Sequence, residues 1–218
     1  MKEPSQQSYW GRLAHTYDRD GEYVVGKPIL RTISKRLSEE QFLGDVVEFG
    51  CGTGYLTRAI ASQARHVVAT DFCDEMLDVA EHQLRAFPNV TIQKADCAST
   101  AFPAGRFDCV FMANLIHVIE DPMPCLLESH RILRDGGLLI AVDFTGYRMR
   151  LIQKVKLVFR YVRRWGVPRR QERKGMSPEE LASLIESAGF RIKDVRLMED
   201  ESNAVYVKGV QCAKPQST

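Results

Sequence analysis

The stretch DVVEFGCGTG, residues 45–54, decides the fold of this chain. A short run of β-branched and aromatic residues is typical of a buried strand. Three glycines at alternate positions then let the backbone turn sharply and pass close under a ligand. Because residues 55–62 have a helical pattern, the free amides of a helix N-terminus would face the same turn. The stretch therefore predicts a strand–turn–helix unit with a ligand site at its junction.

The same alternation of apolar strands and helices continues along the chain, which is typical of parallel strands joined by crossover helices. The sequence thus predicts an α/β, Rossmann-like fold: a seven-stranded, mostly parallel sheet with helices on both faces and a C-terminal antiparallel hairpin. The later strands are expected at 66–72, before Asp96, at Cys109–Ala113, 136–144, Phe190–Met198 and Ala204–Cys212. The helices between them are expected at 74–86, at 122–133 and from a capped start at Ser177 to Ala188.

Composition limits the class of protein. With 218 residues, 44% hydrophobic and 27% charged, the chain can bury a core, and no apolar run approaches the ~20 residues of a membrane span. The N-terminus has no apolar signal segment, so a cytoplasmic location is expected. Six cysteines occur singly, which argues against a metal site or a disulfide framework.

One domain, 1–218, is expected, with four parts. Residues 1–43 would form an N-terminal cap of one or two helices, and 44–145 the ligand-binding core. Residues 146–176 would form a basic amphipathic insert, and 177–218 the last helix and the hairpin.

Acidic residues stand at the ends of the first three predicted strands. Glu48 precedes the glycines, Asp71 ends the second strand and Asp96 ends the third. A carboxylate at the position of Asp71 can accept both hydroxyls of a ribose. A nicotinamide oxidoreductase shares this scaffold, but its fingerprint is GxGxxG, whereas the spacing here is GxGxG. The glycine spacing and the terminal hairpin favour a different nucleoside ligand.

From about Gly44 to Phe144, the order of these motifs resembles the class I S-adenosylmethionine-dependent methyltransferases. The resemblance implies S-adenosyl-L-methionine as cofactor, with the glycine loop at its methionine and ribose part and Asp96 at its adenine. The residues that the resemblance implies for cofactor binding are Tyr17, Glu48, Gly50, Cys51, Gly52, Gly54, Asp71, Phe72, Met76, Asp96, Cys97, Ala98, Asn114 and Leu115.

The expected reaction is methyl transfer to a small-molecule acceptor at an O, N or S atom, without a metal. His117 is the candidate base, because it follows the fourth strand at the edge where ligands bind in open α/β sheets. Tyr147, Phe159 and Trp165 are candidate substrate or lid residues. A module that binds the cofactor without turnover is the alternative from another class, and the oligomeric state stays open.

The insert concentrates positive charge. Residues 148–174 hold eleven Lys and Arg against one acid, a balance of +10, so the rest of the chain carries 2 − 10 = −8. At helical spacing one face gathers Leu151, Ile152, Val155, Val158, Phe159, Val162 and Trp165. This face could cover the substrate pocket as a lid, enter an anionic membrane surface, or meet RNA or an acidic protein. The alternative function is therefore a peripheral membrane methyltransferase with a lipid or amphiphilic acceptor. The sequence after the fourth strand, ANLIHVIEDP, disfavours a nucleic-acid substrate.

Overall fold

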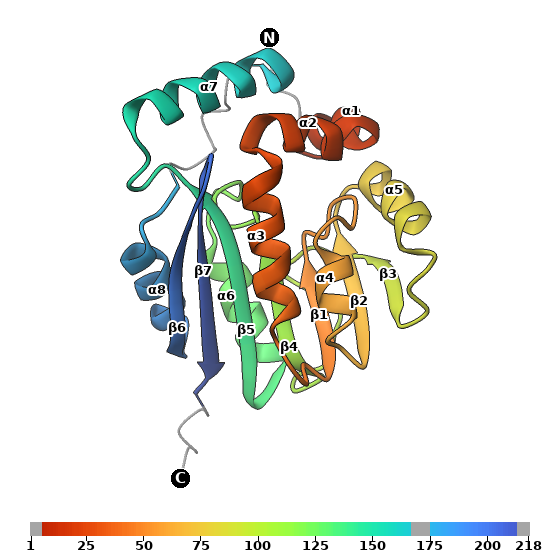
Figure 1. Ribbon diagram of the computed structural model, residues 1–218. Coiled ribbons are helices and arrows are strands. Elements are labelled where there is room, and N and C mark those ends of the chain that lie inside the picture. The colour runs from red at the N-terminus through yellow and green to blue at the C-terminus, as the bar shows by residue number, and fades with distance from the viewer. Residues whose placement is uncertain (1–5, 167–174, 213–218) are drawn as a thin grey trace.

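The computed structural model describes residues 6–166 and 175–212, and its centre is one seven-stranded sheet (Figure 1). The strand order is β3-β2-β1-β4-β5-β7-β6, in which β7 runs antiparallel to both of its neighbours and all other pairs are parallel. This confirms the predicted sheet and hairpin. A dinucleotide-binding Rossmann sheet has the order 3-2-1-4-5-6, so the inserted antiparallel β7 argues against the nicotinamide alternative. The strands are β1 (Asp45–Phe49), β2 (His66–Asp71), β3 (Val90–Lys94), β4 (Phe107–Ala113), β5 (Leu133–Thr145), β6 (Phe190–Glu199) and β7 (Asn203–Gln211).

Helices cover both faces of the sheet and bury two apolar layers. On one face α3 and α4 contribute Ile33 and Ile60, and on the other α6 and α8 contribute Leu126 and Ile185, all fully buried. Such burial on both sides explains why the central strands are continuous apolar runs. The four helices are α3 (Lys27–Ser38), α4 (Thr57–Ala61), α6 (Met123–Ile132) and α8 (Pro178–Ser187); α5 (Asp74–Leu84) follows β2.

Residues 6–25 of the N-terminal segment and the insert lie together at one end of the sheet, beyond the carboxyl ends of the parallel strands (Figure 1). The N-terminal segment forms more pieces than the one or two helices predicted, because a 3₁₀ turn at Ala14–Thr16 interrupts it and Gly26, whose φ is +94°, breaks it again before α3. The insert forms one helix, and its residues 167–174 lie outside the described part of the chain. The N-terminal pieces before α3 are α1 (Gln6–Leu13), the 3₁₀ turn η1 (Ala14–Thr16) and α2 (Tyr17–Val25). The helix of the insert is α7 (Leu151–Trp165).

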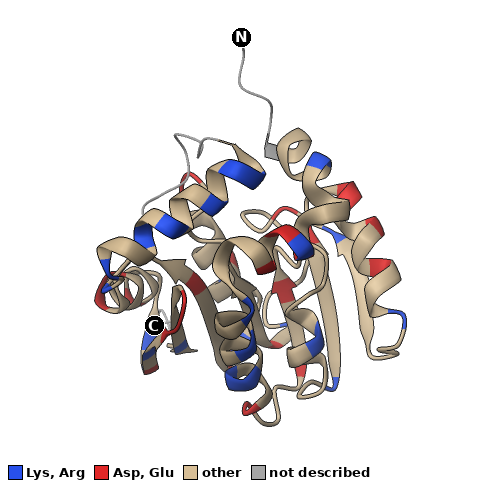
Figure 2. Cartoon of the chain, turned by 45° about the horizontal axis from the view of Figure 1, so that its top comes forward, with Lys and Arg blue, Asp and Glu red and all other residues tan. Residues whose placement is uncertain are grey.

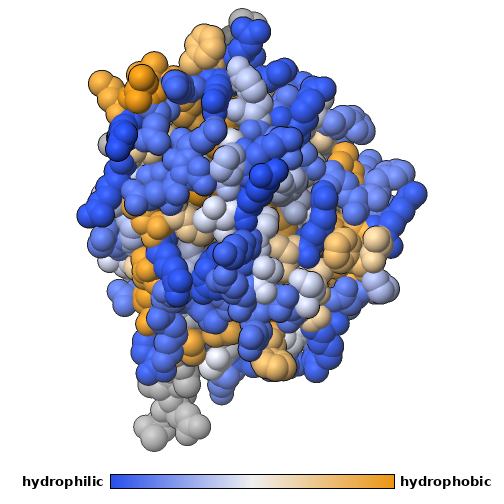
Figure 3. Space-filling view, in the orientation of Figure 1, coloured by the Kyte–Doolittle hydropathy of each residue, from blue (hydrophilic) through white to orange (hydrophobic). Residues whose placement is uncertain are grey.

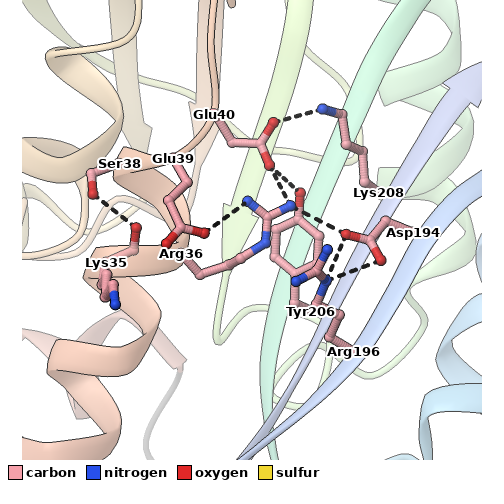
Figure 4. A network of polar contacts seen from close by, with 9 residues as sticks. All are labelled: Lys35, Arg36, Ser38, Glu39, Glu40, Asp194, Arg196, Tyr206 and Lys208. Atoms are coloured by element: carbon pink, nitrogen blue, oxygen red, sulfur yellow. Dashed lines mark hydrogen bonds and ion pairs between the residues drawn. The ribbon is translucent and has the colours of Figure 1, made fainter.

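A buried polar network ties α3 to the hairpin (Figure 4). Glu40, 3% exposed, accepts hydrogen bonds from the Tyr206 hydroxyl and from Lys208 Nζ, each at 2.6 Å, and pairs with Arg36 at 2.8 Å. Arg36 also lies 4.3 Å over the Tyr206 ring. Although burial alone would raise the pKa of Glu40, its hydrogen bonds to Lys208 and Tyr206 lower that pKa overall. The network fixes α3 across β7.

Element boundaries differ from the prediction by a few residues. The helix expected at 55–62 spans only Thr57–Ala61, because the glycine turn continues through Leu56. The capping box predicted at Ser177 is present, with the Glu180 amide donating to the serine hydroxyl at 3.1 Å. No helix within residues 6–166 and 175–212 is long and apolar enough to cross a membrane.

Candidate active site

A cavity of about 430 Å³ opens where the carboxyl ends of the strands meet α1, α2 and α7. This is the edge at which open α/β sheets bind ligands, and the volume is that of a small-molecule site. Its floor comes from the turns after β1, β2, β3 and β4, and its roof from helices, so the cavity joins residues more than 140 positions apart in the sequence.

The glycine loop after β1 lies directly under the cavity. Gly50 has φ +68°, and a Cβ there would stand 2.9 Å from Leu115 Cδ1, so both the conformation and the space require glycine. The Gly52 amide donates to Asp71 Oδ2 at 2.9 Å, and the Cys73 amide donates to Asp71 Oδ1 at 2.9 Å. These bonds hold the Asp71 carboxylate beside the loop.

Two acceptor oxygens at this end of the cavity are buried and have no hydrogen-bond partner among the described residues. They are Glu48 Oε2 and Asn114 Oδ1. Burial raises the pKa of Glu48 to about 8, and the nearby negative charge of Asp71 adds to the shift. Asn114 also has φ +55°, a strained conformation of the kind that gathers at functional sites. Unsatisfied buried acceptors of this kind call for a donor from a ligand.

His117 and Asp143 form a dyad at the centre of the cavity edge. His117 Nδ1 lies 2.5 Å from Asp143 Oδ1, and the His117 amide donates to Asp143 Oδ2 at 3.0 Å. Asp143 is 5% exposed, so its carboxylate is held inside the protein. Two contacts from one carboxylate fix both the backbone and the ring of His117, and a proton on Nδ1 makes Nε2 the accepting nitrogen.

Aromatic side chains form the roof at the other end. Tyr17 of α2 stacks on Trp165 of α7 with 5.7 Å between ring centroids, and Tyr161 meets Trp165 edge-on at 5.1 Å. Below them, Asp18 accepts a hydrogen bond from the Thr53 hydroxyl and another, at 2.7 Å, from Gln83 Nε2. The roof is thus linked to the glycine loop.

Comparison with known proteins agrees with this geometry. The family described as a methyltransferase domain matches residues 47–141. A demethylmenaquinone methyltransferase of Tropheryma whipplei is 25% identical over 203 residues, covering 84% of this chain and 82% of that protein. Residues 47–141, which hold the glycine loop and the strand-end acids, therefore match a methyltransferase domain, consistent with a class I S-adenosylmethionine-dependent methyltransferase.

Two further proteins are similar to this chain over different shares of its length. The ubiquinone/menaquinone biosynthesis C-methyltransferase of Geotalea uraniireducens is 29% identical over 116 residues, covering 50% of this chain and 49% of that protein. The structure of DhpI, solved as a complex with SAH, has a TM-score of 0.70 at 24% identity, covering 96% of this chain and 97% of the other.

Most predicted site residues of the methyltransferase come together at the cavity, although their individual roles stay predictions. His117 and Trp165 both line it. So do the predicted cofactor-binding residues Tyr17, Glu48, Gly50, Cys51, Gly52, Asp71, Phe72, Met76, Asp96, Cys97, Asn114 and Leu115.

Four predicted residues lie elsewhere. Gly54 packs under the loop, where a Cβ would stand 2.7 Å from Leu84 Cδ1, and Ala98 only caps the turn by donating its amide to Asp96 Oδ1 at 2.9 Å. Tyr147 is outside the lining, and its backbone joins the loop after β5 to Asn203. Phe159 is 63% exposed on the outer face of α7, because the inner face presents the series 157, 161 and 165 instead.

Sequence reasoning missed the contact between Asp143 and His117 and two residues of the roof. That contact joins residues 26 positions apart, which no local pattern encodes. Leu157 and Tyr161 line the roof at four-residue spacing with Trp165, a signal that the larger apolar face of the same helix obscured.

Proposed function

We propose that this chain transfers the methyl group of S-adenosylmethionine to an apolar, ring-bearing small molecule. One observation supports this most: a single cavity is lined by the glycine loop and Asp71, by His117 and by an aromatic roof. The end at the glycine loop suits a nucleoside, and the end under the roof suits a flat apolar acceptor.

The cofactor end fits S-adenosylmethionine on the chemistry of its donors and acceptors. The unpartnered oxygens of Glu48 and Asn114 accept hydrogen bonds, and the amino group of the cofactor donates them. The Asp71 carboxylate, already set by two backbone amides, retains lone pairs for ribose hydroxyls. A cationic ligand at this end would favour the charged forms of Glu48 and Asp71, whose pKa values burial raises.

The protein's own part in the reaction is alignment and proton removal. The bound cofactor supplies an electrophilic methyl group on a sulfonium. His117, oriented by Asp143, accepts the proton that the acceptor loses as its electron pair bonds the methyl carbon. A buried carboxylate behind the ring stabilises the resulting imidazolium.

The acceptor class follows from the roof. Leu157, Tyr161 and Trp165 offer apolar and aromatic surface, and Trp165 Nε1 is buried without a partner among the described residues. That N–H can donate to one oxygen on an otherwise apolar acceptor. The sequence predicted an oxygen, nitrogen or sulfur atom as methyl acceptor. The similar proteins named for demethylmenaquinone and for C-methyl transfer make a carbon atom a further possible acceptor. A phenol or quinol accordingly fits this site best.

The test begins with calorimetric titration of the purified chain with S-adenosylmethionine and S-adenosylhomocysteine. Transfer of a labelled methyl group is then followed over a panel of hydroxynaphthoquinols, simple phenols and amines. We expect micromolar binding of both cofactor forms and label in the quinol or phenol fraction.

Three outcomes would contradict parts of the proposal. A folded sample that binds neither cofactor form removes the cofactor assignment. Label found only in amines removes the acceptor class, and binding without any label removes the transfer reaction for this panel.

A further inference from the structure

Helix α7 has an apolar face that nothing in the described structure covers. Leu151 is 78% exposed, Phe159 63%, Val155 59% and Val158 56%, with Ile152 and Val162 beside them. At about 100° per residue these six side chains fall within an arc of about 120°. Figure 3 shows hydrophobic atoms along the upper left margin, over the place of α7 in Figure 1. A contiguous exposed face of this kind marks a surface that binds something.

The opposite face of α7 is attached to the protein, so the helix cannot simply roll inward. Arg160 pairs with Glu201 at 3.2 Å and Arg164 with Asp20 at 3.7 Å. Leu157 and Trp165 line the cavity from the same side. The outer face is therefore presented to solvent by contacts that hold the inner face.

Cations border the exposed face on both sides. By the same angular step, Lys154 lies along one edge, and Lys156 and Arg163 lie along the other. All three are exposed, and residues 151–165 contain no acid. Figure 2 shows the basic bands along this helix. Apolar residues at the centre with Lys and Arg at the rims are the pattern of a helix that lies in the plane of a membrane surface.

We propose that α7 docks this protein on an anionic lipid surface, with Phe159 and its apolar neighbours in the interface and the rim cations at the headgroups. The cations at the rim of α7 favour an anionic lipid surface over other partners. A neutral protein groove would leave the rim cations unmatched, and a nucleic acid would leave the apolar centre in water.

Docking would hold the outer face of α7 on the lipid surface, with the aromatic roof on the inner face of the same helix. Because α7 is at once the docking element and one wall of the cavity, docking would bring the cavity close to an acceptor dissolved in the bilayer. This last step rests on the proposed function, whereas docking itself does not.

The test is co-sedimentation of the full chain with vesicles, a measurement that needs no turnover. We expect binding to vesicles of phosphatidylcholine mixed with phosphatidylglycerol, weaker binding at raised salt, and little binding to phosphatidylcholine alone. The double variant Lys156→Gln/Arg163→Gln should partition about 30-fold less, which corresponds to about 1 kcal/mol for each cation near an anionic surface. Val155→Gln/Phe159→Gln should reduce binding by at least about tenfold through lost apolar insertion.

The matched control removes two exposed cations elsewhere, Arg31→Gln/Lys35→Gln on α3, and should bind like the unchanged chain. Calorimetric binding of S-adenosylhomocysteine, measured on every variant, shows that each one is folded and separates a failure of docking from a failure of the proposed function. Equal binding to both kinds of vesicle, no binding, or equal losses in the control overturns the proposal. A dimer that forms without lipid and that Val155→Gln/Phe159→Gln converts to monomer also overturns the proposal, because a second copy of the chain would then cover the exposed face.

Discussion

The two ends of the cavity are built in different ways. The cofactor end is made of strand ends and tight turns, in which Gly50 meets Leu115 and Asp71 is fixed by two backbone amides. The acceptor end is roofed by side chains from separate helices, with Tyr17 stacked on Trp165 across 148 positions of sequence. One end is set by backbone geometry, and the other by packing between helices.

This difference determines how many kinds of ligand each end can bind. Backbone amides and a buried carboxylate leave little freedom, so the first end binds one kind of ligand. Aromatic contacts contribute about 0.5–1.5 kcal/mol each and can rearrange, so the second end can open, close and accept varied rings. Changes at the first end should therefore alter cofactor affinity, and changes at the second should alter turnover and lid position.

The largest effect is expected where the ends meet, at His117. His117→Ala should lower turnover about 10²- to 10⁴-fold, the usual contribution of a general base. Cofactor affinity should change by no more than about two- to threefold, a free-energy difference of about RT, because the imidazole ring acts on the acceptor. Labelled-methyl transfer and calorimetry measure the two quantities.

The Asp143→Asn variant distinguishes a catalytic role of His117 as base from a purely structural role of the His117–Asp143 contact. If Asp143 orients the ring, this variant should lower turnover and shift its pH profile while cofactor binding holds. Loss of cofactor binding in both variants would mean that the dyad only maintains the loop after β4, and His117 would lose its role as base.

The next effect concerns Glu48, the buried acid at the cofactor end. Its pKa is raised from 4.5 to about 8 by burial, so between these values the folded state holds a proton that the unfolded state releases. The stabilisation is complete below pH 4.5 and is lost as pH rises toward 8, by up to about 1.4 kcal/mol per pH unit. Urea unfolding from pH 5 to 8 should show this slope, and Glu48→Gln should flatten it. A slope that the variant leaves unchanged would assign the proton to another group.

The residues predicted for the cofactor end were found from local determinants, and the structure gathers most of them at one cavity. The spacing of Gly50, Gly52 and Gly54 and the acids at strand ends lie within short segments whose backbone they constrain directly. The seven-stranded, mostly parallel sheet and the hairpin followed from the same patterns, and the structure confirms both.

The acceptor end could not be predicted in this way. A helical wheel shows that α7 is amphipathic, but both faces of this helix hold large apolar residues. Tertiary contacts, among them the ion pairs of Arg160 and Arg164 and the stack on Trp165, decide which face turns inward. The Asp143 contact to His117 depends on how β5 lies beside β4. Such choices are made by tertiary packing, which short-range patterns do not encode.

A third, smaller effect tests the backbone character of the cofactor end. Asp71→Asn should weaken S-adenosylhomocysteine binding by about 1–3 kcal/mol, the range for hydrogen bonds to a charged group. Asp78→Asn, an exposed acid on α5, is the matched control and should bind normally. Equal affinity of Asp71→Asn and the control would remove Asp71 from the ribose contact.

The smallest effect is expected at the roof. Tyr17→Leu removes the stacked ring beneath Trp165 and should loosen α7 by about 0.5–1.5 kcal/mol, whereas Tyr17→Phe keeps the ring and should retain the stack. In a Trp10→Phe background Trp165 is the one remaining tryptophan of the chain, so a red shift of its emission reports opening directly. Because the stack is separate from the backbone hydrogen bonds that set Asp71, cofactor affinity should fall only a few-fold, a free-energy change of about RT. A large loss of affinity without a change in emission would show that Tyr17 serves the cofactor, and the two ends would then be one.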